Sequence, residues 1–276
     1  MLDAVDRLLS IGINRIELGS THNFEEGILE GLKKRNADYL THNFFPPSRE
    51  RLILNIASEN PEIRSKSIAF IKAGIDFAEE LGAAVYTIHP GFLSDPLGEG
   101  ERTGPAFDFR FDSSQVERLQ KNYDHHLEVF FTALDEIAQF VKGRDLKIAI
   151  ETQGSVTKKE FVLFSRPDDF NRFLARGYHT GIGINLNLSH THLAAKINSF
   201  SEKAVIEMLK PRIMAVEVSH SDGHFDDHGT LVAGAWYFDL LADPFFKTTP
   251  LIVEARNVSL ADVSASCELL NQIWKN

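Results

Sequence analysis

The sequence predicts an α/β fold, a TIM (β/α)8-type barrel, on three observations. Short β-rich segments alternate with longer helical patterns along nearly the whole chain, as in repeated βα units around a parallel sheet. The strand segments are mostly apolar, which is typical of strands buried on both faces. The chain has 276 residues, close to the roughly 250 residues of a single-domain barrel. We therefore expect one domain over residues 1–276, and a doubly wound open sheet is the alternative.

Seven short segments rich in apolar and β-branched residues are the expected strands. They are Asn14–Leu18, Asp38–His42, Ala84–His89, Lys147–Thr152, Gly181–Leu186, Ile213–Val218 and Pro250–Glu254. The expected helices show helical spacing of apolar residues, as in the segment that begins at Pro61 and stops before Gly82. They are Leu2–Ser10, Pro61–Leu81, Ser114–Val141, Pro167–Ala175, Ser201–Leu209 and Leu260–Trp274.

Two parts of the chain depart from the regular alternation. A TIM barrel has eight strands, and the one missing here is the first, because the chain opens on the helical segment Leu2–Ser10. Either the first strand lies upstream of this sequence or another element fills its position. The segment Phe92–Ser113 shows neither helical nor strand periodicity. Loops of this length are often functional lids, and a solvated surface loop is the alternative.

Composition limits the partners and the location. The formal net charge is −10, which disfavours a nucleic-acid partner unless a basic groove or a bound metal reverses the charge locally. No segment approaches the ~18 apolar residues of a membrane-spanning helix, and the N-terminus lacks the basic region of a signal peptide. Cys267 is the single cysteine and permits no internal disulfide, which fits a cytoplasmic protein. A homo-oligomer is left open, because periodicity cannot separate an interface from a core.

Histidines and carboxylates gather where a parallel barrel places its reacting groups, at the carboxyl ends of the strands. Of the 11 histidines, eight lie at or just after such ends. They are His22, His42, His89, His190, His192, His220, His224 and His228. Glu151 and Glu254 close two apolar strands, where an unpaired charge is costly. Imidazole and carboxylate are ligands of Zn²⁺, Mn²⁺ and iron, so the pattern predicts a metal centre, although any one of these histidines alone is compatible with a structural role.

Several motifs resemble the xylose isomerase-like TIM-barrel superfamily, most closely its endonuclease IV class. Leu40–Phe45, Leu54–Ser58 and His89-Pro90-Gly91 are similar in order and spacing to the segments around that class's first two histidine ligands. Asp226–Gly234 is similar to its DxH motif with a following glycine. The resemblance covers most of the chain and implies two complete metal sites and a central one. The implied ligands are His42, His89 and Glu151 for one metal, His190, Asp226 and His228 for another, and Glu151 and Glu254 flanking the central metal.

The central site departs from the family pattern at two positions. The family's aspartate, three residues before His190, is Asn187 here, and the family's next histidine corresponds to Glu217 unless His220 replaces it. Asparagine is a weaker, uncharged ligand, so we expect the central site to bind a different metal or none. The resemblance implies a divalent metal cofactor, Zn²⁺ or Mn²⁺, as one to three ions, with Glu217 counted among the ligands.

The first functional hypothesis is a metal-dependent isomerase or epimerase that acts on a small sugar or sugar phosphate through an enediolate. In the isomerase and epimerase branches of the superfamily two glutamates act as acid and base, and Glu151 and Glu254 fill the corresponding positions. Substrate binding is assigned to His22, Asn187 and His220.

Two alternatives stay open. An endonuclease IV-like phosphodiesterase, an apurinic-site endonuclease, would use three metals, and the two complete ligand sets favour it. The loops that would contact DNA, Gly19–Glu26 and Asn43–Ser48, contain no lysine or arginine, which together with the net charge weakens this reading. The second alternative is a non-catalytic barrel that binds a sugar or a partner protein.

Overall fold

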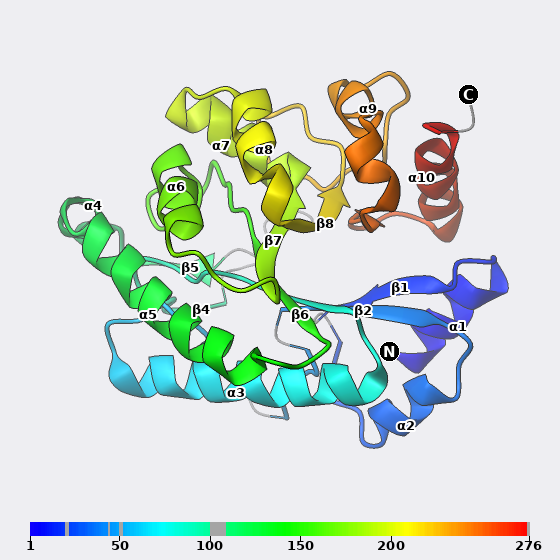
Figure 1. Ribbon diagram of the computed structural model, residues 1–276, viewed down its shortest axis with the longest axis horizontal. Helices are drawn as coiled ribbons and strands as arrows, with labels where there is room; N and C mark the ends of the chain where they lie inside the picture. The colour runs from blue at the N-terminus through cyan, green and yellow to red at the C-terminus, as the bar shows by residue number, and fades with distance from the viewer. Residues whose placement is uncertain (20–21, 44, 50–51, 100–108, 275–276) are drawn as a thin grey trace. The chain divides into compact units, whose positions relative to one another are not determined.

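The computed structural model describes residues 1–19, 22–43, 45–49, 52–99 and 109–274, which Figure 1 traces in colour. The chain divides into two compact units. Unit 1 comprises residues 1–95, 123–150 and 177–183. Unit 2 comprises residues 96–122, 151–176 and 184–276. The single domain expected over residues 1–276 stays a prediction.

The main sheet confirms the α/β class and all seven predicted strands. In the described part of the chain its order is β1-β2-β3-β6-β7-β8-β9, and the pairs β1–β2, β2–β3, β3–β6, β7–β8 and β8–β9 are parallel. The strands are β1 (Arg15–Leu18), β2 (Asp38–His42), β3 (Val85–Ile88), β6 (Lys147–Glu151), β7 (Ile182–Asn187), β8 (Ile213–Val218) and β9 (Leu251–Val253). Each strand begins and ends within one residue of its predicted bounds.

Unit 1 combines β1, β2 and β3 with most of β6 and with helices on the flanks of these strands. The helices are α1 (Leu2–Ser10), α2 (Ile28–Lys33), α3 (Pro61–Leu81) and α5 (Tyr123–Val141). The ends of α3 are the predicted ones, because the Asn60 side chain accepts the backbone N–H of Glu62, Pro61 starts the first turn and Gly82 ends the helix in a left-handed conformation. Helices α3 and α5 pack against each other (Figure 1).

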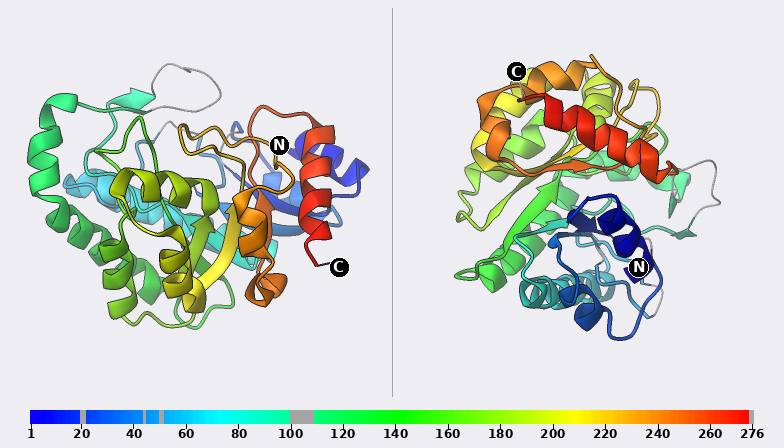
Figure 2. Two further views of the ribbon diagram at one scale, coloured as in Figure 1. Left: turned by 90° about the horizontal axis from the view of Figure 1, so that it is seen from above. Right: turned by 90° about the vertical axis from the view of Figure 1, so that its right-hand side faces the viewer.

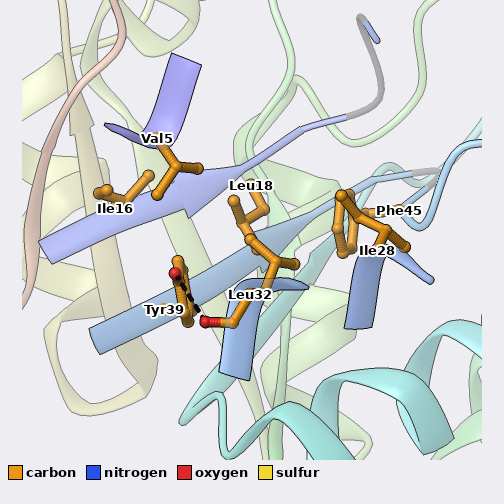
Figure 3. Packing of buried hydrophobic residues seen from close by; sticks show 7 residues of the cluster. All are labelled: Val5, Ile16, Leu18, Ile28, Leu32, Tyr39 and Phe45. Atoms are coloured by element: carbon orange, nitrogen blue, oxygen red, sulfur yellow. Dashed lines mark hydrogen bonds between the residues drawn. The ribbon is translucent and has the colours of Figure 1, made fainter. Parts of the chain in front are cut away.

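A buried apolar cluster fixes β1 and β2 within unit 1. Figure 3 shows its members: Val5, Ile16, Leu18, Ile28, Leu32, Tyr39 and Phe45. Alternate residues of a strand share a side, so Ile16 and Leu18 both enter this cluster while Glu17 between them faces away. The Tyr39 hydroxyl donates to the main-chain oxygen of Leu32 at 3.3 Å, which satisfies a polar atom that would otherwise be buried without a partner.

Unit 2 contains the ends of β6 and β7, the strands β8 and β9, and mostly short helices. The helices are α4 (Val116–Lys121), α6 (Pro167–Ala175), α7 (Leu188–Asn198), α8 (Glu202–Leu209), α9 (Trp236–Leu241), α10 (Leu260–Gln272) and the 3-10 segments η1 (Ser113–Gln115), η2 (Lys210–Arg212) and η3 (Pro244–Thr248). Helix α10, red in Figure 2, packs against β9. None of the helices in the described part of the chain is long and apolar enough to cross a membrane.

Three sequence-based expectations need correction. The single helix expected over Ser114–Val141 is interrupted at Asn122, between α4 and α5. Helix α7 was not predicted, and it starts directly after β7 because Asn187 both ends the strand and caps the helix. The segment Phe92–Ser113 is not wholly irregular, since β4 (Gly98–Glu99) pairs antiparallel with β5 (Phe109–Arg110). Residues 100–108, the middle of the expected lid, lie outside the described residues.

Candidate metal centre

Polar residues of unit 2 occupy the carboxyl ends of neighbouring strands. Glu151 ends β6, Asn187 ends β7, Glu217 lies in β8 and Glu254 follows β9. Asn187 pairs with Glu217 in the parallel register of β7 and β8, and the Glu254 backbone N–H donates to the main-chain oxygen of Val218 at 3.2 Å. Glu151, Asn187 and Glu217 are at most 1% exposed. Four polar side chains thus meet in a place where an unpaired charge is costly.

The amide of Asn187 lies between three glutamates. Its Nδ2 donates to Glu151 Oε1 at 3.0 Å and to Glu254 Oε2 at 3.0 Å. The same nitrogen lies 2.7 Å from Glu217 Oε2. Its Oδ1 accepts the backbone N–H of His190 at 3.1 Å, which is the N-cap hydrogen bond of α7. The two ends of the amide are therefore distinguished, and it is the N–H₂ end that faces the carboxylates.

A histidine–aspartate–histidine cluster adjoins the glutamates. His190 Nε2 lies 3.2 Å from Asp226 Oδ1, and His228 Nε2 lies 2.9 Å from the same oxygen. In the described structure Asp226 Oδ1 and His228 Nε2 are buried, and neither has a hydrogen-bond partner beside this ion-pair contact. The three residues offer ligand atoms close enough to hold one ion. Buried donor atoms of this kind that converge without pairing fit a zinc or manganese site.

Glutamates hold the outer nitrogens of both histidines. Glu151 Oε1 lies 2.8 Å from His190 Nδ1, and Glu254 Oε2 lies 2.8 Å from His228 Nδ1. A carboxylate on the outer nitrogen of a metal-binding histidine fixes the ring orientation and the tautomer. In both rings Nε2 is therefore the nitrogen that can bind a metal, and both Nε2 atoms face Asp226.

Opposite charges control the ionisation of this cluster. Burial alone would lower the pKa of His190, but the Asp226 and Glu151 carboxylates outweigh burial and raise that pKa well above its usual value. Burial disfavours the charged form of Asp226, yet His190 and His228 hold its pKa well below the usual range. His228 and the neighbouring arginine lower the pKa of Glu254 to about 2 against the effect of burial. Asp226 and Glu254 therefore stay ionised and attract positive charge, which histidine protons or a divalent cation can supply.

Unit 1 brings two further histidines together. His42 ends β2 and His89 follows β3, and their Nε2 atoms lie 3.1 Å apart. Glu17 Oε2 lies 3.4 Å from His42 Nδ1, so this ring also has a carboxylate on its outer nitrogen. The Nε2 atom of His42 faces His89, which could bind the same metal ion. The predicted set of His42, His89 and Glu151 draws on both units and stays a prediction.

The remaining predicted site residues differ in their surroundings. The His220 ring lies against Tyr237 with the ring centroids 6.1 Å apart, and its possible replacement of Glu217 stays a prediction. The His220 backbone pairs with Gly229, which closes the loop that carries Asp226 and His228. His22 is exposed in the segment after β1. Substrate binding by His22, Asn187 and His220 stays a prediction.

Two charged residues of these clusters were missed from the sequence. Arg256 Nη2 donates to Glu254 Oε1 at 3.0 Å, and the Arg256 backbone N–H donates to the main-chain oxygen of His228 at 2.9 Å. Glu17 is the other. The available signal was strand alternation: Arg256 lies two residues after Glu254, and Glu17 is a carboxylate between two apolar strand residues.

Gly91 permits the close turn that follows His89. Its φ is +92°, and a Cβ there would lie 2.2 Å from Asn55 Oδ1, the atom that accepts the backbone N–H of Phe92. We expect Gly91→Ala to lower the free energy of unfolding by roughly 2–5 kcal/mol in urea denaturation, from backbone strain plus overpacking. Gly143→Ala is the matched control, because Gly143 has φ +86° and nothing within 4 Å. An equal loss in both variants would contradict the proposed clash.

A family model and three solved structures share the fold of this chain. The family, described as a xylose isomerase-like TIM barrel, matches residues 5–273. A D-tagatose 3-epimerase-like protein has a TM-score of 0.73 and 18% identity, over 99% of this chain and 92% of that one. A Thermus thermophilus protein soaked with ZnCl₂ has a TM-score of 0.65 and 18% identity, over 99% of this chain and 93% of that one. Endonuclease IV from the same organism has a TM-score of 0.59 and 15% identity, over 99% of this chain and 93% of that one. At these identities the likenesses show the fold alone.

Proposed function

The chain belongs to the xylose isomerase-like TIM barrel family, and on that premise we propose that it is a divalent-metal-dependent isomerase or epimerase of a small sugar or sugar phosphate. One observation carries the proposal. Glu151 Oε1 and Glu254 Oε2 each lie 3.0 Å from the same atom, Asn187 Nδ2. Two carboxylates held next to each other by one amide suit a reaction in which one group removes a proton from carbon and another returns it.

His190, Asp226 and His228 are the residues that would hold the metal. Three protein ligands of this type leave a coordination position open, which is typical of catalytic metal sites. When bound, the metal acts as a Lewis acid for the substrate oxygen on which negative charge develops. The partnerless Asp226 Oδ1 and His228 Nε2 support this assignment, and the zinc-soaked relative makes Zn²⁺ the first ion to test.

The glutamates divide the proton transfer between them. The side chain of Glu254 is 19% exposed, and with its pKa lowered to about 2 it is a carboxylate at neutral pH, so it can accept the proton from the carbon next to the carbonyl. Asn187 Nδ2 and Arg256 Nη2 hold its two oxygens in place. Glu151, 1% exposed, carries a proton at the start and gives it to the enediolate, to the neighbouring carbon for isomerisation or to the opposite face for epimerisation. Proton exchange with solvent then restores both glutamates.

Solvent isotope exchange tests this function. The metal-loaded protein is incubated in D₂O with a panel of ketoses, aldoses and their phosphates, and deuterium at carbon is followed by NMR. We expect incorporation into at least one sugar, with loss of the signal on chelation. Glu62→Gln is a matched control, because Glu62 is exposed on α3 and pairs with Lys66, and it is expected to exchange at the wild-type rate. No exchange in any metal-loaded sample would reject the isomerase.

An endonuclease IV-like phosphodiesterase is the second candidate. The observation that favours it is the additional histidine pair of unit 1, with His42 and His89 Nε2 atoms 3.1 Å apart, because a single-metal isomerase does not need it. Hydroxide activation by several metals would then cleave the phosphodiester. Cleavage of a duplex with an abasic site, lost in His42→Ala and His228→Ala, would support this candidate. Absence of cleavage at every salt concentration would remove it.

A non-catalytic barrel is distinguished by its response to chelation. Such a protein is expected to purify without metal and to unfold at the same temperature with and without chelator. The convergent ligand atoms of unit 2 argue against it, since burying them without a cation is costly. A cytoplasmic location is part of the proposal for a sugar-converting enzyme and rests on the single cysteine.

A further inference from the structure

We infer that the Asn187 amide takes the place of the central divalent cation, so that metal in unit 2 binds only at His190, Asp226 and His228. The fold family implies a cation between the strand-end carboxylates, and the residues present do not fit one. Three carboxylate oxygens surround Asn187 Nδ2 at 2.7–3.0 Å, as they would surround a metal ion. The atom at their centre is an uncharged hydrogen-bond donor of the chain itself.

Asn187 cannot turn its oxygen toward the carboxylates at low cost. Its Oδ1 is the N-cap acceptor of α7 for the His190 backbone N–H. Rotating the amide by half a turn would place N–H₂ against that N–H and remove the cap, which destabilises the start of the helix. The backbone is fixed as well, because the Asn187 N–H donates to Thr152 Oγ1 at 3.0 Å and its main-chain oxygen accepts from Thr191 Oγ1 at 2.8 Å. The ligand oxygen that an aspartate would present is therefore absent.

Two of the surrounding carboxylates also accept hydrogen bonds from other donors of the chain. Glu217 Oε1 accepts from Asn185 Nδ2 at 2.7 Å while its Oε2 faces Asn187. Glu254 Oε1 accepts from Arg256, and Glu254 Oε2 faces both Asn187 and a histidine. Buried polar groups that are paired in this way need no cation. In the histidine–aspartate–histidine cluster, by contrast, the ligand atoms Asp226 Oδ1 and His228 Nε2 have no hydrogen-bond partner, which favours that position for the metal.

Asn187→Asp tests the inference by metal content. One oxygen of the new carboxylate keeps the N-cap, and the other faces three carboxylates with no donor between them, so a cation becomes necessary. After dialysis against Zn²⁺ or Mn²⁺, elemental analysis is expected to show one equivalent more metal in Asn187→Asp than in the wild type. Its unfolding temperature is expected to drop in chelator more than that of the wild type. An unchanged metal content would overturn the inference.

Asn185→Asp is the matched control for added charge. The substitution introduces the same charge on the same strand. The Nδ2 atom of Asn185 is bonded to Glu217, one of the three glutamates, and we expect no additional metal in this variant. Extra metal in this variant too would show that the gain reflects charge alone and would overturn the inference.

Glu217→Gln in the wild-type background decides the matter even if Asn187→Asp does not fold. If the centre holds no cation, removing one of its carboxylates leaves the metal content unchanged. A loss of one equivalent would show that a metal binds there and would overturn the inference. Because every readout is metal content or unfolding temperature, these results stand whether or not the isotope-exchange assay supports an isomerase.

Discussion

Asp226→Asn is expected to weaken metal binding in unit 2 by at least about 100-fold, beyond the effect usual for a residue that only supports a ligand. Asp226 Oδ1 lies 2.9 Å from His228 Nε2 and 3.2 Å from His190 Nε2, and it is the anionic member of this ligand set. An amide oxygen in its place is neutral and a poorer ligand. The measurement is competition with a chromophoric chelator, combined with the visible spectrum of the Co²⁺-substituted protein.

Asp222→Asn controls for the loss of one negative charge from the same loop. The Asp222 carboxylate accepts the backbone N–H of His224 at 2.8 Å and belongs to none of the groups of side chains that could hold a metal ion in the described part of the chain. Wild-type affinity is expected for this control. If Asp226→Asn also bound metal with wild-type affinity, the assignment of His190, Asp226 and His228 as the metal site would be wrong, whatever the reaction.

The sequence predicted the sheet well but missed the helices α2, α7 and α9, and α7 was missed for a physical reason. Strands β3, β6, β7 and β8 are mostly buried apolar runs, and α3 has a proline at its start and a glycine at its end, so local signals determine their bounds. Helix α7 lacks such a signal. It buries Ser189, His190 and Thr191 among its apolar residues, so its polar and apolar positions do not form the two faces that helical periodicity detects.

The failure to predict α7 also explains what the sequence could not show about the candidate site. Strand ends rich in histidine and carboxylate predicted the right residue types at one edge of the sheet. Asn187 was assigned to substrate binding and was expected to weaken the central metal site; in the structure its oxygen caps α7 and its nitrogen faces the glutamates. Without α7 the direction of the amide could not be inferred. The partners Glu17 and Arg256 were missed because their roles depend on distances to His42 and Glu254.

Glu254→Gln is expected to reduce isotope exchange by roughly 10²–10⁴-fold, the usual contribution of a general base or acid. The variant keeps the size of the side chain but replaces the proton-accepting carboxylate with an amide. Because Glu254 Oε2 also holds His228 Nδ1 at 2.8 Å, metal affinity can fall about 10–100-fold as well. The rate is therefore measured at saturating metal, with occupancy confirmed by elemental analysis.

Chemical rescue separates proton transfer from support of the metal ligand. In Glu254→Ala the carboxylate is deleted and space for a small acid is left, so added formate is expected to restore part of the exchange rate in proportion to its concentration. A purely structural role for Glu254 would instead leave formate without effect once the metal is bound. Glu254→Gln with full metal occupancy and more than about a tenth of the wild-type rate would likewise contradict the assignment, because a missing general base costs at least about 10²-fold. Arg256 fixes the carboxylate from the other side, since its hydrogen bond to Oε1 leaves Oε2 as the oxygen that faces Asn187 and His228.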